Sequence, residues 1–135
     1  DYSWRQEGLS VGSSYLWFDK NVANDPNASG KSIFDPSPLG WRVPRYGTFT
    51  VMNNDNCEYS SKDNALLYNG VVKMPMTGYR SNNSGNVNDY GSQGNIRLST
   101  QIDASFGYNF VYNPYVDEDT NNTLSDGFCV RCIEE

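Results

Sequence analysis

The chain contains three cysteines, the most reactive side chains in a sequence that has no histidine. Cys129 and Cys132 have the C-x-x-C spacing of redox motifs, but such a motif needs a helix after a strand, and nothing after Cys132 could form it. Three cysteines without histidine cannot complete a tetrahedral zinc site. Two alternatives remain: one disulfide from Cys57 to either Cys129 or Cys132, or three free buried thiols.

Acidic residues gather just before Asn121, where Asp117, Glu118 and Asp119 follow one another. Clustered oxygens suit calcium, but the EF-hand spacing is absent, so a solvated acidic turn is the preferred interpretation. Without histidine no Ser-His-Asp or Cys-His arrangement is available. Nothing brings two carboxylates such as Asp103 and Asp117 together for glycoside hydrolysis. We therefore expect no enzymatic activity, no metal and no cofactor.

Tyrosine and asparagine are the candidate ligand-binding side chains. Residues 81–95 predict a long loop with almost no aliphatic side chains. Its composition is typical of recognition surfaces, in which Tyr supplies rigid contact area and Asn or Ser adapts its hydrogen bonds. The candidate ligand-binding residues, within and around this loop, are Tyr79, Asn82, Asn83, Asn86, Asn88, Tyr90, Arg97, Tyr112 and Tyr115.

A later tyrosine-rich stretch has the alternation of a strand. Tyr108, Phe110 and Tyr112 share one face, which is predicted to be core for the first two. Tyr112 is expected at the exposed end, where it would contact a ligand together with Tyr115. The opposite, outward face would carry Asn109, Val111 and Asn113.

Composition and length limit the possible fold and partners. The 135 residues suit a single domain spanning residues 1–135. Asn, Ser and Gly disfavour long helices, whereas Tyr and Phe suit strands. We therefore expect an α+β fold with little helix, short antiparallel strands and long loops. The net charge of −6 and the lack of a basic stripe predict no nucleic-acid partner. No apolar run is long enough to predict membrane insertion by this domain.

The stretch Lys31–Pro44, KSIFDPSPLGWRVP, is here called the elbow. Each of its three prolines fixes its own φ and disfavours helix at the residue before it, so a rigid non-helical segment is expected. Gly40 permits a turn. The elbow should deliver Trp41 and Val43 into the core, with Arg42 facing the other way.

Other elements can be placed along the chain. A short helix is expected after Tyr46, with Thr48 as its N-cap, and Asp117–Asn122 should be a hairpin-like loop. Trp4 and Trp17 are expected in the core. The predicted strands are Tyr2–Gln6, Tyr15–Phe18, one within Gly70–Tyr79, and the segments IRLST, FGYNFVYNPYV and GFCVRCIE.

The segment DPSPLGWRVP resembles the DPCPxGWRVPT signature of the Bacteroidetes major paralogous domain family, also called FISUMP. KMPMTGYR resembles that family's LPAAGYR. Asp89–Gly94 resembles its VGSSGYYWSS turn, with Leu98–Thr100 in the place of WSST. GFCVRCIEE resembles its terminal GFSVRCVKD. The four segments fall in the expected order and cover about residues 30–135.

This resemblance implies a C-type-lectin-like fold. It also implies a place at the C-terminus of a surface lipoprotein or fimbrillin-like protein, anchored at the outer membrane or extracellular. Two positions depart from the family. Its DPCP cysteine is Ser37 here, so a disulfide from the elbow to the terminal RC motif cannot form. The tryptophan of WSST is Arg97 or Leu98 here, depending on the alignment.

Together these observations favour a ligand-binding or adhesion domain of a bacterial cell-surface protein that recognises a glycan or a surface protein. The first alternative is a structural or assembly module of a fimbria-like fibre, which the full-length architecture would discriminate. The second is a degenerate enzyme of the sulfatase-modifying type, because Cys129 invites comparison with the cysteines of the formylglycine-generating relatives.

Overall fold

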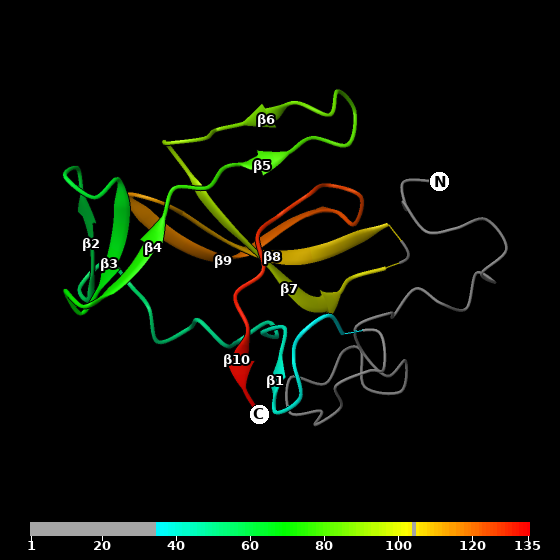
Figure 1. The fold of residues 1–135 in the computed structure, drawn as a ribbon, viewed down its shortest axis with the longest axis horizontal. Helices are drawn as coiled ribbons and strands as arrows, with labels where there is room; N and C mark the ends of the chain where they lie inside the picture. The colour runs from blue at the N-terminus through cyan, green and yellow to red at the C-terminus, as the bar shows by residue number, and fades with distance from the viewer. Residues whose placement is uncertain (1–34, 104) are drawn as a thin grey trace, which may run out of the picture.

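The computed structural model describes residues 35–103 and 105–135. They form ten strands in four small antiparallel sheets, with no helix among them (Figure 1). The expected α+β class, and with it the C-type-lectin-like architecture, is wrong for this part of the chain, which is all-β. The strands expected at Tyr2–Gln6 and Tyr15–Phe18, and the core positions expected for Trp4 and Trp17, lie outside the described residues.

The strands are short except in the last of the four sheets. By sheet they are β1 (Trp41–Arg42) with β10 (Ile133–Glu134); β2 (Cys57–Ser60), β3 (Ala65–Tyr68) and β4 (Val72–Pro75); β5 (Tyr79–Arg80) with β6 (Val87–Asn88); and β7 (Gly94–Gln101), β8 (Phe106–Asn113) and β9 (Tyr115–Thr123).

The core lies between one face of the β7–β8–β9 sheet and the β2–β3–β4 sheet. Ile96 pairs with Phe110 across β7 and β8, and both pack against Leu66 of β3 and Met74 of β4. The prediction that Phe110 is core is confirmed. Tyr108 is half-buried and packs against the same cluster, with its ring centre 4.4 Å from that of Tyr46.

The opposite face of the same sheet is buried as well, and it is polar. Asn109 was expected to face solvent, but its side chain is 0% exposed, and Val111 is 9% exposed. Asn95 and Arg97 on β7, paired with Val111 and Asn109 respectively, are also buried. Of the three residues predicted to point outward, only Asn113 is exposed. Both faces of the sheet are therefore covered, which alternation alone does not reveal.

The described part of the elbow is non-helical, as predicted. The carboxylate of Asp35 accepts hydrogen bonds from the backbone N–H groups of Ser37 (2.8 Å) and Val43 (3.0 Å). Gly40 turns the chain with φ +78°. Val43 is buried, but Trp41 is 44% exposed, so its expected core position is wrong. The strand β1 ends at Arg42, and Val43 then bonds to Asp35, so Trp41 and Val43 do not share one regular strand face.

The helix expected after Tyr46 is replaced by consecutive turns. Thr48 does not cap a helix, because its Oγ1 accepts a hydrogen bond from the backbone N–H of Arg45, three residues earlier (3.1 Å). Gly47 has φ +89°, a value that a right-handed helix does not allow. The turns bring Phe49 against Phe110, with their ring centres 4.6 Å apart.

The stretch Asp117–Asn122, expected to be a loop, lies inside strand β9. The chain reverses instead at Pro114, where Asn113 and Tyr115 face each other across the hairpin. Proline has no N–H to donate to a sheet, so it ends β8. The strands predicted within Gly70–Tyr79 and at IRLST are confirmed as β4 and β7. GFCVRCIE is a regular strand only at Ile133–Glu134.

Candidate functional site

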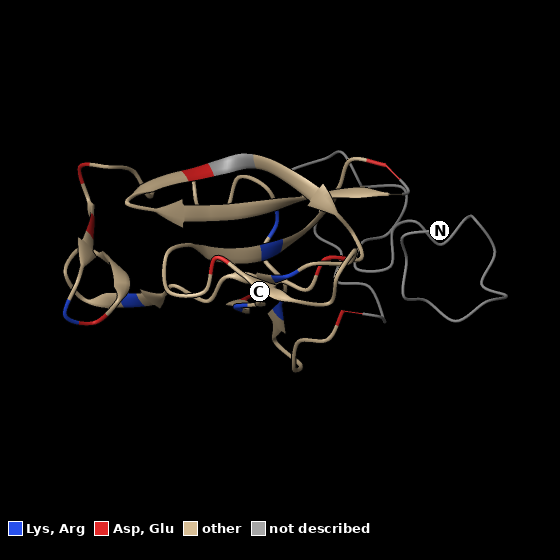
Figure 2. Ribbon diagram, turned by 90° about the horizontal axis from the view of Figure 1, so that it is seen from above, with Lys and Arg blue, Asp and Glu red and all other residues tan. Residues whose placement is uncertain are grey.

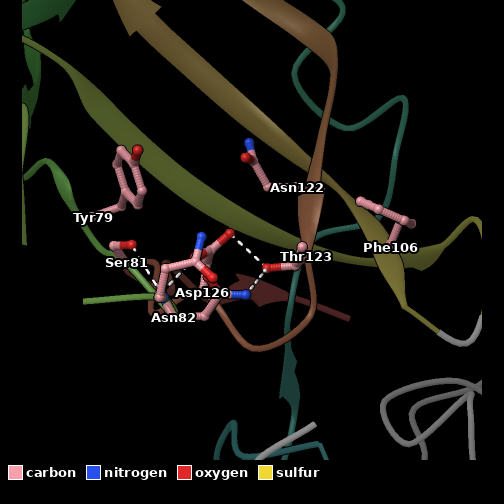
Figure 3. Close-up of a pocket in the computed structure, with 8 residues that line it drawn as sticks. Tyr79, Ser81, Asn82, Phe106, Asn122, Thr123 and Asp126 are labelled. Atoms are coloured by element: carbon pink, nitrogen blue, oxygen red, sulfur yellow. Dashed lines mark hydrogen bonds between the residues drawn. The ribbon is translucent and has the colours of Figure 1, made fainter. Parts of the chain in front are cut away.

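A pocket of about 390 Å³ opens where the β5–β6 hairpin meets the end of the β8–β9 pair (Figure 3). Its walls come from β5 and the turn after it, from the first residue of β8, and from the end of β9 with the turn that follows. Three of the predicted ligand-binding residues, Tyr79, Asn82 and Asn83, lie in it. The full lining is Tyr79, Ser81, Asn82, Asn83, Phe106, Asn122, Thr123 and Asp126.

A polar cluster forms one side of this pocket. The backbone N–H of Asn82 donates to Oδ1 of Asp126 (2.9 Å), and Nδ2 of Asn82 donates to the hydroxyls of Thr123 and Ser125 (3.0 Å each). The Thr123 hydroxyl in turn donates to Oδ2 of Asp126 (2.7 Å). The loop after β5 is thereby fixed to the turn after β9, more than forty residues later in the chain.

Two aromatic rings stand on either side of the polar cluster (Figure 3). Tyr79 is half-buried and stacks on Phe128, with ring centres 5.4 Å apart. Phe106 is 40% exposed. Its backbone N–H and that of Ser105 both donate to Oδ1 of Asp103 (2.8 and 2.7 Å), which orders the turn before β8.

Arg97 lies behind the pocket and not in it. Its side chain is 4% exposed, and its guanidinium donates to the backbone carbonyls of Thr123 (2.7 Å), Asp126 (3.2 Å) and Gly107 (3.4 Å). It also lies over the ring of Phe128. Burial lowers the pKa of Arg97 to about 10, opposed by the negative charge of Asp126. The expected exposed ligand contact at Arg97 is therefore wrong, and the residue instead holds the turn that carries Asp126.

Three asparagines form a row of hydrogen bonds that leads from the pocket into the sheet. Nδ2 of Asn122 donates to Oδ1 of Asn109 (3.1 Å), and Nδ2 of Asn109 donates to Oδ1 of Asn95 (3.4 Å). The row crosses β9, β8 and β7 in turn. Because Asn122 uses one of its two amide hydrogens inward, its other hydrogen and its carbonyl oxygen are left for contacts in the pocket.

Tyr112 does not lie at an exposed end. It is 2% exposed, and its hydroxyl donates to the carbonyl of Pro75 (2.9 Å). Burial raises the pKa of Tyr112 to about 12, with a further contribution from Cys129. The expectation that Tyr112 is available for ligand contact is therefore wrong, because β8 continues into the core up to this residue.

The remaining predicted residues are accessible but do not line the pocket. Tyr90 and Tyr115 are 78% and 69% exposed. Asn86 is exposed in the β5–β6 hairpin, whereas Asn88 is half-buried and donates weakly from Nδ2 to the Tyr79 hydroxyl (3.5 Å). Asn88 therefore touches a pocket residue without facing the pocket itself.

Sequence reasoning missed five lining residues, namely Ser81, Phe106, Asn122, Thr123 and Asp126. Pairing of β8 with β9 places Phe106 opposite Thr123. No local pattern could show this, because Asn122, next to Thr123, was the last residue of a stretch predicted to be a loop. The sequence did point to Asn82 as a ligand-binding residue, and the side chain of Asn82 bonds to Thr123 at the end of β9.

All three cysteines are free thiols, so the expected disulfide is absent. The alternative of three buried thiols is also wrong, because only Cys57 is buried. Cys132 is half-buried and Cys129 is exposed. Burial raises the pKa of the Cys57 thiol, opposed by a hydrogen bond from the backbone of Asn53. The backbone of Cys129 forms an isolated parallel β-bridge with Ile96 of β7.

Charged side chains do not assemble a metal site within the described ranges, where no three Cys, Asp or Glu residues come together. Asp117 belongs to an extended strand, and such a strand does not fold consecutive side chains around one ion. Basic positions are scattered over separate elements (Figure 2). No helix capable of crossing a membrane occurs in the part of the chain that the structure describes.

Comparison with protein-family models, with curated proteins and with solved structures finds no match to this chain.

Proposed function

We propose that this domain is a non-enzymatic recognition module that binds a glycan in the pocket between Tyr79 and Phe106. The observation that carries the proposal is the pairing of two accessible aromatic rings with a fixed cluster of amide, hydroxyl and carboxylate groups. Sugars present apolar C–H faces and many hydroxyls, and they need both kinds of partner at once. A concave site of about 390 Å³ also suits a small ligand better than a flat protein surface.

We also propose that the domain belongs to a bacterial cell-surface protein, in which it serves adhesion or ligand capture. This part rests on the resemblance of four segments to the FISUMP family. Two of these segments contribute to the pocket region: KMPMTGYR contains Tyr79, and GFCVRCIEE contains Phe128, which stacks on Tyr79. The elbow segment lies elsewhere, where β1 pairs with β10.

A glycan array followed by nuclear magnetic resonance titration of the full chain tests the proposal. Backbone signals of Ser81–Asn83 and Phe106 should shift on binding. Phe106→Ala should weaken binding about five- to tenfold, because stacking on an accessible ring is worth about 1–1.5 kcal/mol. Tyr115→Ala is the matched control, since it removes an exposed aromatic side chain outside the pocket. Equal loss in both variants, or binding that survives Phe106→Ala unchanged, would disprove the site.

A further inference from the structure

Resting on the proposed function, we infer that this pocket selects uncharged sugars and discriminates against acidic ones that carry carboxylate or sulfate groups. The inference follows from which polar atoms the pocket leaves available and from where the nearby cations are directed. It specifies the chemical class of ligand within the same site.

The polar atoms left for a ligand are uncharged donors together with neutral and charged acceptors. The hydroxyls of Tyr79 and Ser81 accept bonds from Asn88 and Asn83, so each keeps its own hydrogen to donate. Asn82 uses both Nδ2 hydrogens on Thr123 and Ser125, so its Oδ1 is the free end of that amide. Asn122 uses one Nδ2 hydrogen on Asn109, which leaves the second hydrogen and Oδ1. Asp126 contributes two carboxylate oxygens, each accepting one hydrogen bond and able to accept another. A neutral sugar matches this set, because each of its hydroxyls both donates and accepts, and Asp126, the one charged lining residue, needs donors.

None of the lining residues is a cation, and the two nearest arginines are engaged elsewhere. Arg80 stands between Tyr79 and Ser81 on β5, so strand alternation turns its side chain away from theirs, and its guanidinium donates to the carbonyl of Gly85 (2.6 Å). Arg97 is buried against the ring of Phe128, and its guanidinium donates hydrogen bonds to backbone carbonyls. An acidic sugar would therefore find no Lys or Arg side chain in the pocket lining to pair with.

One carboxylate adds a repulsive element, because Asp126 lies in the pocket. A ligand carboxylate near Asp126 would meet a like charge in a half-exposed setting, which weakens binding by about fivefold. Added salt screens such a repulsion, so the discrimination should shrink as ionic strength rises.

The test is a resonance titration of the full chain with methyl β-glucoside and methyl β-galactoside, and with their uronic-acid counterparts, which differ only at C6. We expect each neutral glycoside to bind at least about fivefold more tightly than its acidic partner at low salt, with a narrower gap at high salt. Acidic sugars that bind equally well or better would overturn this inference and leave the proposed function standing. No binding by any of the four would overturn both.

Asp126→Asn sharpens the test, because the amide keeps the shape of the side chain and an acceptor for the Asn82 N–H. The ratio of neutral to acidic affinity should fall towards one. Glu58→Gln, which removes the same charge from exposed β2, should leave the ratio unchanged. A ratio that is the same in Asp126→Asn as in the native chain would contradict the inference. Where that variant does not fold, the salt dependence in the native chain decides.

Discussion

The guanidinium carbon of Arg97 lies 4.3 Å from the centre of the Phe128 ring. Phe128 also stacks on Tyr79, so one aromatic ring separates a buried cation from a pocket side chain. The same guanidinium bonds to the carbonyls of Thr123 and Asp126. The edge strand β7 is thereby joined to the turn that forms the polar side of the pocket.

Removing this arginine should be costly. Arg97→Ala removes three hydrogen bonds to backbone carbonyls from a buried site, and we expect a loss of at least about 3 kcal/mol in the free energy of unfolding. Arg97→Lys keeps the charge but not the planar fork, and should lose about 2 kcal/mol. Urea denaturation measures both. Arg131→Ala, which removes an exposed arginine with one backbone bond, should change stability by less than about 0.5 kcal/mol. Comparable losses at Arg97 and Arg131 would contradict the role assigned to Arg97.

Two glycines allow the cost of backbone strain to be measured separately from the cost of a steric clash. Gly70 and Gly78 have similar positive φ values of +68° and +63°. A Cβ at position 70 would meet open space, whereas one at position 78 would collide with the backbone of Asn88 and lie 2.7 Å from the Tyr90 nitrogen. Gly70→Ala should cost about 1 kcal/mol from φ alone. Gly78→Ala should cost at least about 2 kcal/mol more. Thermal unfolding measures the difference, and equal costs would refute the close approach.

Alkaline pH should reveal the burial of Tyr112. Its pKa of about 12 in the folded chain lies above the usual value of 10.0, so the unfolded chain loses this proton first. The associated stability is present below pH 10 and is lost as the pH rises towards 12. Native protein and Tyr112→Phe should differ by about 1 kcal/mol at pH 8, from the bond to Pro75. That difference should fall by about 1.4 kcal/mol by pH 11. If the difference in the free energy of unfolding did not change with pH, the pKa of Tyr112 would not be raised in the folded chain.

The asparagine row gives a further test. Asn109 is fully buried and exchanges hydrogen bonds with Asn95 and Asn122. Asn109→Ala should cost about 2–3 kcal/mol, since it leaves two partly enclosed amides without a partner. Asn113→Ala, four residues later on the same strand but exposed, should cost less than about 0.5 kcal/mol. Chemical denaturation distinguishes them, and a neutral Asn109→Ala would mean that the row is not a stabilising network.

The sequence predicts local features of this fold well where one residue type forces the backbone. The prolines and Gly40 of the elbow, and the apolar alternation around Phe110, lead to the observed geometry. Prediction from the sequence fails where a residue far along the chain determines whether a side chain is buried. Asn109 looks like a solvent-facing residue, yet Asn95 and Asn122 satisfy its amide and allow it to be buried.

The same physical limit applies to the candidate site. Tyr79, Asn82 and Asn83 could be identified because tyrosine and asparagine in a loop are typical of recognition surfaces. Phe106 and Asp126 could not, because they meet only once β8 pairs with β9 and the next turn folds back. Polar and charged residues in DEDTNN look like a loop, and their strand is stabilised by pairing with the apolar β8.

The pocket takes one wall from the two-residue strand β5 and the turn after it, and the other from the long strands β8 and β9, which belong to a different sheet. Near the pocket, the backbones of the two units are joined by a reciprocal pair of bonds between Arg80 and Gly127, 2.8 Å each. Local opening of the hairpin breaks these two bonds and the contacts of Asn82, but none of the β8–β9 pairs of the larger sheet. A ligand bound between Tyr79 and Phe106 would suppress this local opening. Its binding should therefore slow hydrogen exchange of the backbone amides of Arg80 and Gly127.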